Sequence, residues 1–324
     1  MSRYERQVRC HAFGSSGQNR LENSTLLIIG AGALGSAVSE QLARAGAGRL
    51  VICDMDVVEY SNLHRQSCYT EEDAAANMLK ADALAFHLKA INSNTDIITV
   101  TQEVTSLNII ALIHQYKPDM VIDGTDAFST RFLINEVCHK LQLPWVYGAC
   151  LGTKGTVYAV DYTSACLKCL LADEQTSGQD CSIAGILPPV AHMTASMQTA
   201  EIMNYMANRC FSGQLLTFDM KSMRFQQTLA DKLKNPDCKT CCHGHYPRLN
   251  ERPLKVMKLC GGKYMVRLTP AHFTETTFRF QKSSPYFKYY EGPHYTISFF
   301  HDGRIIIQGL DRIEDAERFI AESI

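Results

Sequence analysis

The sequence lacks a net charge of either sign, a long apolar run and an N-terminal targeting segment. Its 32 Lys and Arg residues nearly balance 33 Asp and Glu residues, which leaves a formal net charge of −1. This balance gives no general electrostatic attraction to nucleic acid or to an anionic membrane. No apolar stretch approaches the roughly 20 residues of a membrane-spanning helix, and the polar start MSRYERQVRCH has no signal-peptide core. We therefore expect a cytoplasmic chain with neither nucleic-acid nor membrane partners.

Cysteine, in contrast, is abundant. The 324 residues include 13 cysteines, an odd number that disulfides cannot pair completely. The composition is otherwise globular, with 46% hydrophobic and 20% charged residues, and the length corresponds to about two domains. Thiols stay reduced in the cytoplasm, so clustered cysteines there are more often metal ligands or catalytic groups than disulfides.

Apolar runs that alternate with helical patterns predict a parallel sheet in the first 250 residues. Buried strands are expected at 25–29, 49–54, 96–103, 120–123 and 145–148, with 156–161 leaving the parallel region. Helices are expected within 1–24 and at 33–45, 80–92, 106–116, 130–141 and 188–208. Such alternation is typical of an α/β, Rossmann-like fold, a mostly parallel sheet with helices on both faces.

The pattern changes after residue 250. Short strand-like runs are expected at 254–260, 264–268, 276–280, 295–300 and 304–308. Asp302 and Gly303 predict a hairpin turn, and Asp311 with Glu314 fits a capping box before a final helix. We expect residues 1–250 and 251–324 to form separate domains, the second a small α+β C-terminal extension.

A G-x-G-x-x-G motif follows the first expected strand and opens a helix. Its glycines are Gly30, Gly32 and Gly35, with Ala33 at the start of the helix. Backbone N–H groups at such a helix start face a phosphate, and Asp54 after the next strand is placed for a ribose hydroxyl. The motif alone also suits NAD or FAD, so an NAD-dependent oxidoreductase is one alternative. A second alternative is that the glycines are needed only for close packing of the helix against the strand.

Two cations follow the second strand. Arg65 lies in the run Ser61-Asn62-Leu63-His64-Arg65-Gln66, and Lys80 begins the next expected helix. A planar guanidinium clamps phosphate oxygens in two places, which an ATP-using enzyme needs and a dehydrogenase does not. Taken singly, each cation also fits a solvated surface charge.

A carboxylate-bearing turn follows the fourth expected strand, at Asp123-Gly124-Thr125-Asp126. Open α/β sheets bind ligands at this edge, and a carboxylate there can hold Mg²⁺ against a triphosphate. Alternatively, Asp126 only caps the helix that follows.

Four cysteines form two C-x-x-C pairs that suit one tetrahedral Cys₄ zinc site. They are Cys166, Cys169, Cys238 and Cys241. A redox dithiol is the alternative. Three neighbours of the second pair are possible substitute ligands, namely Cys242, His243 and His245.

A fifth cysteine, Cys181, lies in a loop before a helix that starts with proline. It is a candidate nucleophile, because the positive end of a helix dipole lowers the pKa of a nearby thiol. The alternative is an inert loop thiol. Arg6, in the polar N-terminal segment, reads by itself as a solvated charge.

Together and in order, these motifs resemble the bacterial ubiquitin-activating-like adenylyltransferases. That family includes the molybdopterin-synthase adenylyltransferase and the thiamine-biosynthesis sulfur-carrier adenylyltransferase. The resemblance covers residues 1 to about 245 and rests on Arg3-Tyr4-x-Arg6-Gln7, the glycine motif with Asp54, Asn62-Leu63-x-Arg65-Gln66, Lys80, Thr125-Asp126, Arg131 and the paired C-x-x-C motifs.

The resemblance implies an enzyme that uses ATP to adenylate the C-terminal Gly-Gly carboxylate of a small ubiquitin-like sulfur-carrier protein. The products are an acyl-adenylate and pyrophosphate, ahead of thiocarboxylate formation for thiamine or molybdopterin synthesis. Arg65 and Lys80 would stabilise charge at the α-phosphate. Asp126 would hold Mg²⁺, and Asp54 would bind the ribose.

The resemblance also implies partners. Arg6 would reach the ATP site of a second subunit in a homodimer, and Cys181 matches a position where some members bond covalently to the carrier. The C-terminal segment has no rhodanese-like active-site loop, so we expect a separate sulfur-donor protein. One departure from the family is Ala127, where Asn is usual. A non-catalytic subunit of a heterodimeric activating enzyme is a further alternative, against which the presence of Arg6, Arg65, Lys80 and Asp126 argues.

Overall fold

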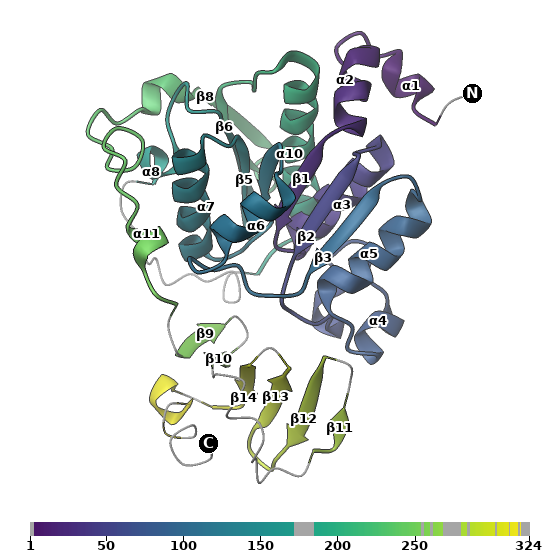
Figure 1. The fold of residues 1–324 in the computed structure, drawn as a ribbon, viewed down its shortest axis with the longest axis vertical. Coiled ribbons are helices and arrows are strands. Elements are labelled where there is room, and N and C mark those ends of the chain that lie inside the picture. The colour runs from purple at the N-terminus through teal and green to yellow at the C-terminus, as the bar shows by residue number, and fades with distance from the viewer. Residues whose placement is uncertain are drawn as a thin grey trace. The chain divides into compact units, whose positions relative to one another are not determined.

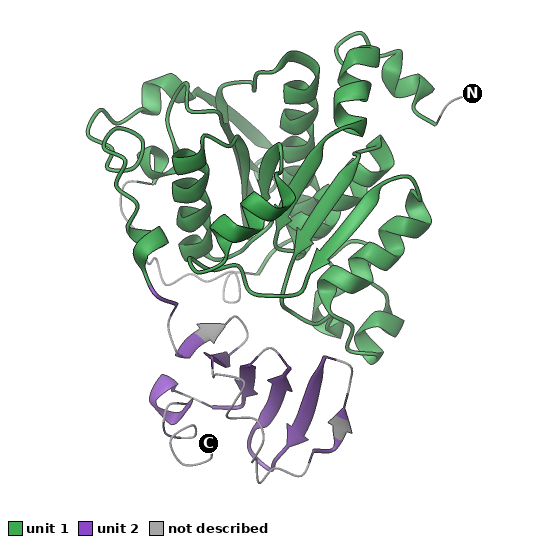
Figure 2. Ribbon diagram, in the orientation of Figure 1, with its two compact units in different colours: residues 1–251 green, residues 252–324 purple. Residues whose placement is uncertain are grey.

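Figure 1 shows the fold in a computed structural model, which describes residues 3–171, 185–253, 256–259, 262–267, 280–283, 286–301, 303–310, 312–316 and 318. The chain divides into two compact units, Met1–Glu251 and Arg252–Ile324 (Figure 2). Within the described ranges, no helix combines the length and the hydropathy that crossing a bilayer requires.

An eight-stranded sheet of the described residues forms the centre of the first unit, in the order β3-β2-β1-β4-β5-β6-β7-β8. The strands are β1 Thr25–Ile29, β2 Arg49–Cys53, β3 Asp96–Val100, β4 Met120–Asp123, β5 Trp145–Leu151, β6 Lys154–Val160, β7 Gln214–Asp219 and β8 Arg224–Leu229. Strands β3, β2, β1, β4 and β5 pair in parallel, whereas β5 to β8 pair antiparallel. The predicted mostly parallel α/β sheet is therefore confirmed.

Helices pack on both faces of this sheet (Figure 1). The described helices of this unit are α1 Glu5–Val8, α2 Gly14–Glu22, α3 Ala33–Ala45, α4 Glu71–Ala75, α5 Lys80–Ile91, α6 Ile109–Tyr116, α7 Phe128–Leu141, α8 Leu167–Leu170, α10 Pro188–Asn208 and α11 Pro247–Asn250. Two short 3₁₀ turns, η1 Tyr60–Asn62 and η2 Ala230–Leu233, complete the described elements.

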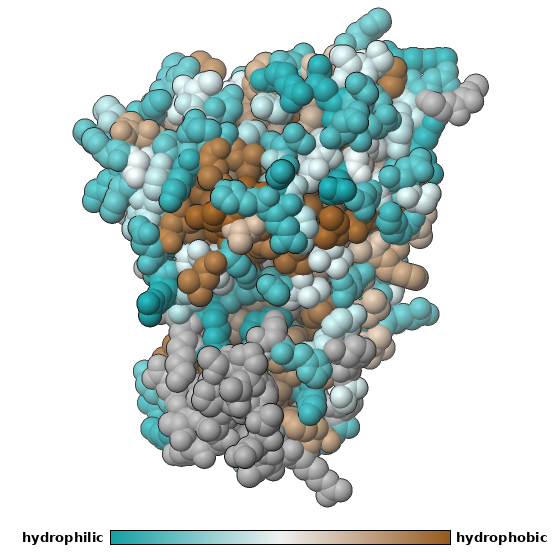
Figure 3. Space-filling model, viewed as in Figure 1, coloured by the Kyte–Doolittle hydropathy of each residue, from teal (hydrophilic) through white to brown (hydrophobic). Residues whose placement is uncertain are grey.

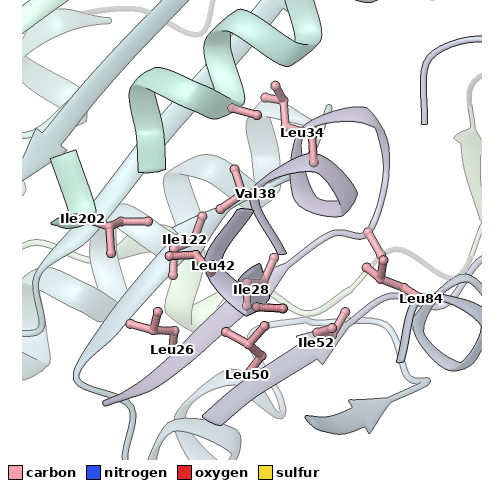
Figure 4. Packing of buried hydrophobic residues seen from close by; sticks show 14 of the residues in the cluster. Leu26, Ile28, Leu34, Val38, Leu42, Leu50, Ile52, Leu84, Ile122 and Ile202 are labelled. Carbon is pink, nitrogen blue, oxygen red and sulfur yellow. The ribbon is translucent and has the colours of Figure 1, made fainter. Parts of the chain in front are cut away.

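Each face of the sheet has its own apolar core. Leu26 and Ile28 of β1 belong to one buried cluster, while Leu27 and Ile29 belong to the other. Figure 4 shows the first cluster, in which the side chains Leu26, Ile28, Leu50 and Ile52 of β1 and β2 gather with residues of α3, α5 and α10. Burial on both faces explains why these strands read as continuous apolar runs.

Five helices and strands of the first unit are not predicted by the sequence pattern: α4, α8, α11, β7 and β8. Strand β8 is an edge strand whose side chains are almost all exposed, so it has no apolar alternation to detect. Helix α4 has five residues and is fixed by a capping box between Thr70 and Asp73. Strand β3 is shorter than expected and ends at Val100, while β5 extends to Leu151 in its antiparallel pairing with β6.

The second unit contains an antiparallel sheet of described strands in the order β11-β12-β13-β14-β10-β9. They are β9 Val256–Leu259, β10 Lys263–Arg267, β11 Lys282–Ser283, β12 Phe287–Glu291, β13 Thr296–Phe300 and β14 Arg304–Gln308. Residues 313–316 are helical, and Ala316 packs into the core of this sheet. The small C-terminal α+β extension is thus confirmed. The strand expected at 276–280 falls, except for Phe280, outside the described residues, as do Asp302 and Asp311.

The surface of the first unit is mixed in polarity. On the face seen in Figure 3, apolar side chains gather over the middle of this unit, in the region of α6 and α7, with polar groups around them. Leu107, just before α6, and Phe128, which begins α7, are among the large apolar residues that stay exposed.

Candidate nucleotide and metal sites

The candidate nucleotide site lies at the carboxyl ends of β1, β2 and β4, where the glycine motif turns into α3. Gly30 has a φ of +94°, and a Cβ there would lie 2.6 Å from the carbonyl oxygen of Gly124. A Cβ on Gly35 would overlap the carbonyl oxygen of Gly30. A Cβ on Gly32, the N-cap of α3, would meet no atom closer than 3.9 Å. Packing therefore requires Gly30 and Gly35, whereas Gly32 leaves open space at a helix start whose N–H groups favour anions.

Asp54 fastens this turn to the end of β2. Its Oδ2 accepts a hydrogen bond of 2.6 Å from the N–H of Ala31, and its Oδ1 accepts one of 2.7 Å from the N–H of Asp56. Burial raises the pKa of Asp54, and the nearby charge of Lys80 partly opposes that rise. The structure thus places Asp54 beside the glycine turn, and its ribose contact stays a prediction.

Lys80, the first residue of α5, brings a buried positive charge to the site. Its Nζ lies 3.0 Å from Oδ2 of Asp56, and its side chain is 9% exposed. Burial opposes the charged form, but the carboxylates of Asp56 and Asp54 outweigh it and raise the pKa of Lys80 above its usual value. The contact of Asp56 with Lys80 is not predicted from the sequence, where the one signal is a second acid two residues after Asp54.

The segment after η1 packs against the glycine turn. Gln66 is 7% exposed, and within the described part of the chain its buried Oε1 has no hydrogen-bond partner. Its Nε2 would lie 4.0 Å from a Cβ on Gly32. The amide nitrogen of Gln66 is thus the atom placed near the open space at Gly32, where it can donate to an acceptor of a bound ligand.

The side chains of Arg65 and Asn62, from the same motif as Gln66, are held on the 3₁₀ turn η1. Arg65 donates from Nη1 to the carbonyl of Ser61 at 3.0 Å, and Asn62 donates to Oγ of Ser61 at 3.2 Å. Tyr69 ties the motif to the site by donating to the carbonyl of Ala31 at 2.7 Å. The segment that carries Arg65 is therefore anchored at the glycine turn.

The two acids at the carboxyl end of β4, Asp123 as its last residue and Asp126 in the turn that follows, have different environments. Asp123 is fully buried and accepts hydrogen bonds from Thr125 and from Nε of Arg131, the latter at 3.2 Å. Asp126 is exposed, and its charge contributes to the raised pKa of Lys80. Ala127, not Asp126, is the N-cap of α7, and no side chain caps that helix. Asp126 is thus the acid of this turn that is accessible to a cation near Lys80.

Arg6 is not brought to this site within one chain. It is exposed on α1, which is held where α3 and α5 end: Gln7 donates to the carbonyl of Ala45, and Arg3 to that of Ile91. The glycine turn lies at the opposite end of α3, whose 13 residues span about 20 Å. Cys181 lies outside the described residues.

The four predicted cysteine ligands converge on one point. Their sulfur atoms all lie within 4.8 Å of one another, although Cys166 is the N-cap of α8, Cys169 lies within α8 and the other two follow η2. Sγ–Sγ distances are 3.9 Å for Cys166–Cys169, 3.7 Å for Cys166–Cys238 and 3.5 Å for Cys169–Cys241. Thiolates at about 2.3 Å from a tetrahedral zinc ion stand about 3.8 Å apart, so this set fits such an ion.

A buried amide supports the thiol cluster. Asn135 of α7 places Nδ2 3.8 Å from Sγ of Cys166, and its Oδ1 accepts from the N–H of Leu167 at 3.0 Å. Cys242 is exposed beside Cys241 and is not a member of the converging set. The geometry therefore favours the four C-x-x-C thiols over the substitute ligands.

This fold and these two candidate sites define a class of protein: an α/β chain with a glycine-rich turn at the carboxyl edge of its parallel strands and a cluster of four thiols that could hold a metal ion. The model of the ThiF family matches residues 4–240. The chain belongs to the ThiF family, and the predicted resemblance to ubiquitin-activating-like adenylyltransferases is confirmed.

Named relatives are adenylyltransferases or activating enzymes. The chain is 37% identical over 261 residues to the sulfur carrier protein ThiS adenylyltransferase of Bacillus subtilis, covering 80% of this chain and 77% of that protein. It is 31% identical to the SAMP-activating enzyme E1 of Haloferax volcanii, with 75% and 90% covered. Identity to the adenylyltransferase and sulfurtransferase MOCS3 of Caenorhabditis briggsae is 35%, with 80% of this chain and 64% of that protein covered. The chain therefore spans less than two thirds of that relative.

Solved structures show the same fold. The crystal structure of E. coli MccB with ATP matches with a TM-score of 0.63 and 19% identity, over 74% of each chain. The complex of MccB with MccA-N7isoASN matches with a TM-score of 0.63 and 20% identity, over 74% of this chain and 75% of that one.

Proposed function

We propose that this chain uses ATP to adenylate the C-terminal Gly-Gly carboxylate of a small ubiquitin-like sulfur-carrier protein. The observation that carries the proposal is the charged, buried Lys80 beside the open turn at Gly32. The printed names of the relatives, which include a ThiS adenylyltransferase, support it.

The proposed chemistry is attack of the carrier carboxylate on the α-phosphate, with pyrophosphate as leaving group. Lys80 and Arg65 stabilise the negative charge that develops there, because fixed charges in a water-poor site cost no reorganisation during the reaction. The turn at Gly32 receives phosphate oxygens, and the side-chain amide of Gln66 donates to the nucleotide. Asp54 binds the ribose. Asp126 would hold Mg²⁺, which neutralises phosphate charge when it is bound.

The four thiols would hold Zn²⁺ in a structural role, because a tetrahedral site with four protein ligands has no position left for substrate. Zinc there would join α8 to the segment around Cys238 and so stabilise the first unit. On this proposal, residues 1–250 form the adenylyltransferase domain with its zinc site. Residues 251–324 form the small C-terminal domain.

The partners belong to the same proposal. The chain acts as a homodimer in which Arg6 completes the ATP site of the other subunit, since α1 lies far from its own glycine turn. A separate protein donates sulfur to the acyl-adenylate. Cys181 is the candidate for a covalent acyl–sulfur link to the carrier.

Pyrophosphate exchange into ATP tests the proposed reaction directly. Purified chain is incubated with ATP, Mg²⁺, labelled pyrophosphate and one Gly-Gly carrier at a time, from the thiamine and molybdopterin branches. In a parallel incubation with ATP and Mg²⁺ but without pyrophosphate, each carrier is weighed by intact-mass spectrometry. We expect exchange and an adenylylated carrier with one branch, and none with the same carrier lacking its last glycine. Exchange at background with every carrier would contradict the proposal, and binding of NADH instead would favour the oxidoreductase alternative.

A further inference from the structure

Asp56 contacts Lys80 twice, through its backbone and through its side chain. The N–H of Lys80 donates to the carbonyl of Asp56 at 2.8 Å, and Nζ of Lys80 lies 3.0 Å from Oδ2 of the same residue. Two residues on, the N–H of Val58 donates to the carbonyl of Met78 at 2.8 Å. The turn after β2 is thereby fixed against the start of α5.

The ammonium of Lys80 needs such a partner. It is buried, and it sits at the N-terminal end of a helix, where the helix dipole disfavours a positive charge. Three carboxylates face it: Asp54 and Asp56 from the turn after β2, and Asp126 from the turn after β4. Both oxygens of Asp54 already accept backbone N–H groups, and Asp56 is the carboxylate within ion-pair distance.

A continuous chain of contacts links this ammonium to the glycine turn. Nζ of Lys80 lies 3.0 Å from the Asp56 carboxylate, the N–H of Asp56 donates to Asp54 at 2.7 Å, and Asp54 accepts from the N–H of Ala31 at 2.6 Å. Ala31 lies between Gly30 and Gly32. This series of contacts fixes the distance between the ammonium of Lys80 and the turn that receives the phosphates.

We propose that Asp56 is a positioning residue for the adenylation reaction, whose carboxylate holds the ammonium of Lys80 in register with the glycine turn. This rests on the proposed function, because it assigns the ammonium to the reacting phosphate. Asp56 acts through Lys80 and does not itself contact the nucleotide.

The test compares Asp56→Asn with Asp82→Asn. The second variant removes an equal charge from the first turn of α5, two residues after Lys80 and away from the contact chain. Pyrophosphate exchange gives kcat and the KM for ATP. Separately, acetylation of the Lys80 amine is timed at pH 8 without ATP or carrier, and peptide mass spectrometry scores Lys80 against Lys89.

For Asp56→Asn we expect kcat to fall roughly 10- to 100-fold, because misplacing a catalytic group by about 1 Å costs that much. The KM for ATP changes less than about threefold, since ground-state binding is kept. Acetylation of Lys80 accelerates several-fold, because its amine has lost its ion pair. Asp82→Asn behaves as wild type in both assays. Asp56→Glu, which keeps the charge, restores part of the lost kcat and covers the case in which the Asn variant misfolds.

Native kcat in a folded Asp56→Asn variant, or unchanged acetylation of Lys80, would overturn this role for Asp56. A raised Mg²⁺ requirement with unchanged acetylation would also overturn it and assign Asp56 to metal binding. Acetylation needs neither ATP nor carrier, so it tests the contact even if no carrier supports exchange. Absence of exchange with every carrier contradicts the proposed function but leaves the ion pair between Asp56 and Lys80 untouched.

Discussion

At the scale of single residues, Glu136 of α7 is a buried acid that the proposed chemistry does not use. It is 4% exposed, and its Oε2 accepts a hydrogen bond of 3.1 Å from the N–H of Leu249 in α11. Burial raises the pKa of Glu136 from 4.5 to about 7, although Arg248 and Lys168 oppose that rise. The folded chain therefore keeps a proton between about pH 4.5 and pH 7 that the unfolded chain has released.

Stability must then fall as pH rises through that window, because the folded state binds more protons there than the unfolded state. We expect Glu136→Gln, which keeps a carbonyl acceptor for Leu249, to match wild type near pH 5. Near pH 8 we expect it to be more stable by about 1 to 3 kcal/mol. Thermal unfolding at pH 5, 6, 7 and 8 measures this. The control is Glu251→Gln, which removes the exposed carboxylate paired with Arg248. A difference from wild type that stays constant with pH would contradict the expectation.

At the scale of elements, two glycines of the turn between β1 and α3 are expected to have different roles. Gly35 is needed for packing, and Gly32 is needed for nucleotide binding. Gly35→Ala places a methyl group on the carbonyl of Gly30, so we expect a thermal midpoint lower by several degrees and loss of nucleotide binding. Gly32→Ala meets no protein atom within 3.9 Å. We expect it to keep its midpoint within about 2 °C and to weaken ATP binding roughly tenfold or more, because the methyl group occupies the open space at the helix start. Calorimetric titration with ATP checks both, and native affinity in Gly32→Ala would show that phosphate binds elsewhere.

The cluster of four cysteines is a second feature at this scale, because it brings α8 next to a segment that is distant in sequence. Cys238→Ser should reduce bound zinc from one equivalent per chain to less than about half and lower the thermal midpoint, because metal binding contributes folding free energy. The matched control is Cys242→Ser, an exposed neighbour outside the converging set. Zinc content by plasma emission spectroscopy checks this. Loss of zinc in the Cys242 variant, with retention in the Cys238 variant, would reverse the ligand assignment.

Whether an element could be predicted from the sequence depends on whether its burial leaves a recognisable pattern of apolar residues. Strands β1, β2 and β4 are buried on both faces, so each can be recognised in the sequence as a continuous apolar run. The C-x-x-C pairs can likewise be recognised by the spacing of their cysteines. Strand β8 is polar and exposed at the sheet edge, so only its pairing with β7 defines it. Asp56 could be read off the chain, but its contact with Lys80 depends on how the turn after β2 meets α5. That juxtaposition is tertiary, and residue patterns do not express it.

At the scale of the whole molecule, the position of α1 bears on how a complete site is assembled. The helix is fixed beside the ends of α3 and α5, so the exposed Arg6 lies about a helix length from the glycine turn of its own chain. If Arg6 contributes to catalysis, it must do so in a second subunit. This makes the proposed homodimer a requirement for activity.

Mixing two inactive variants tests that requirement. We expect Arg6→Ala and Lys80→Ala each to lose at least about 99% of pyrophosphate exchange as homodimers, because each removes charge stabilisation from both sites. In a mixed dimer, one site receives Arg6 from the Lys80 variant and Lys80 from the Arg6 variant, so it is intact, while the other site carries both defects. Random mixing makes about half of the dimers mixed and restores about a quarter of wild-type activity. Lys80→Ala mixed with Asp126→Ala is the contrasting pair. Lys80 and Asp126 serve the same site of one chain, so that mixture should stay inactive. Recovery in neither mixture would show that Arg6 does not act across the dimer.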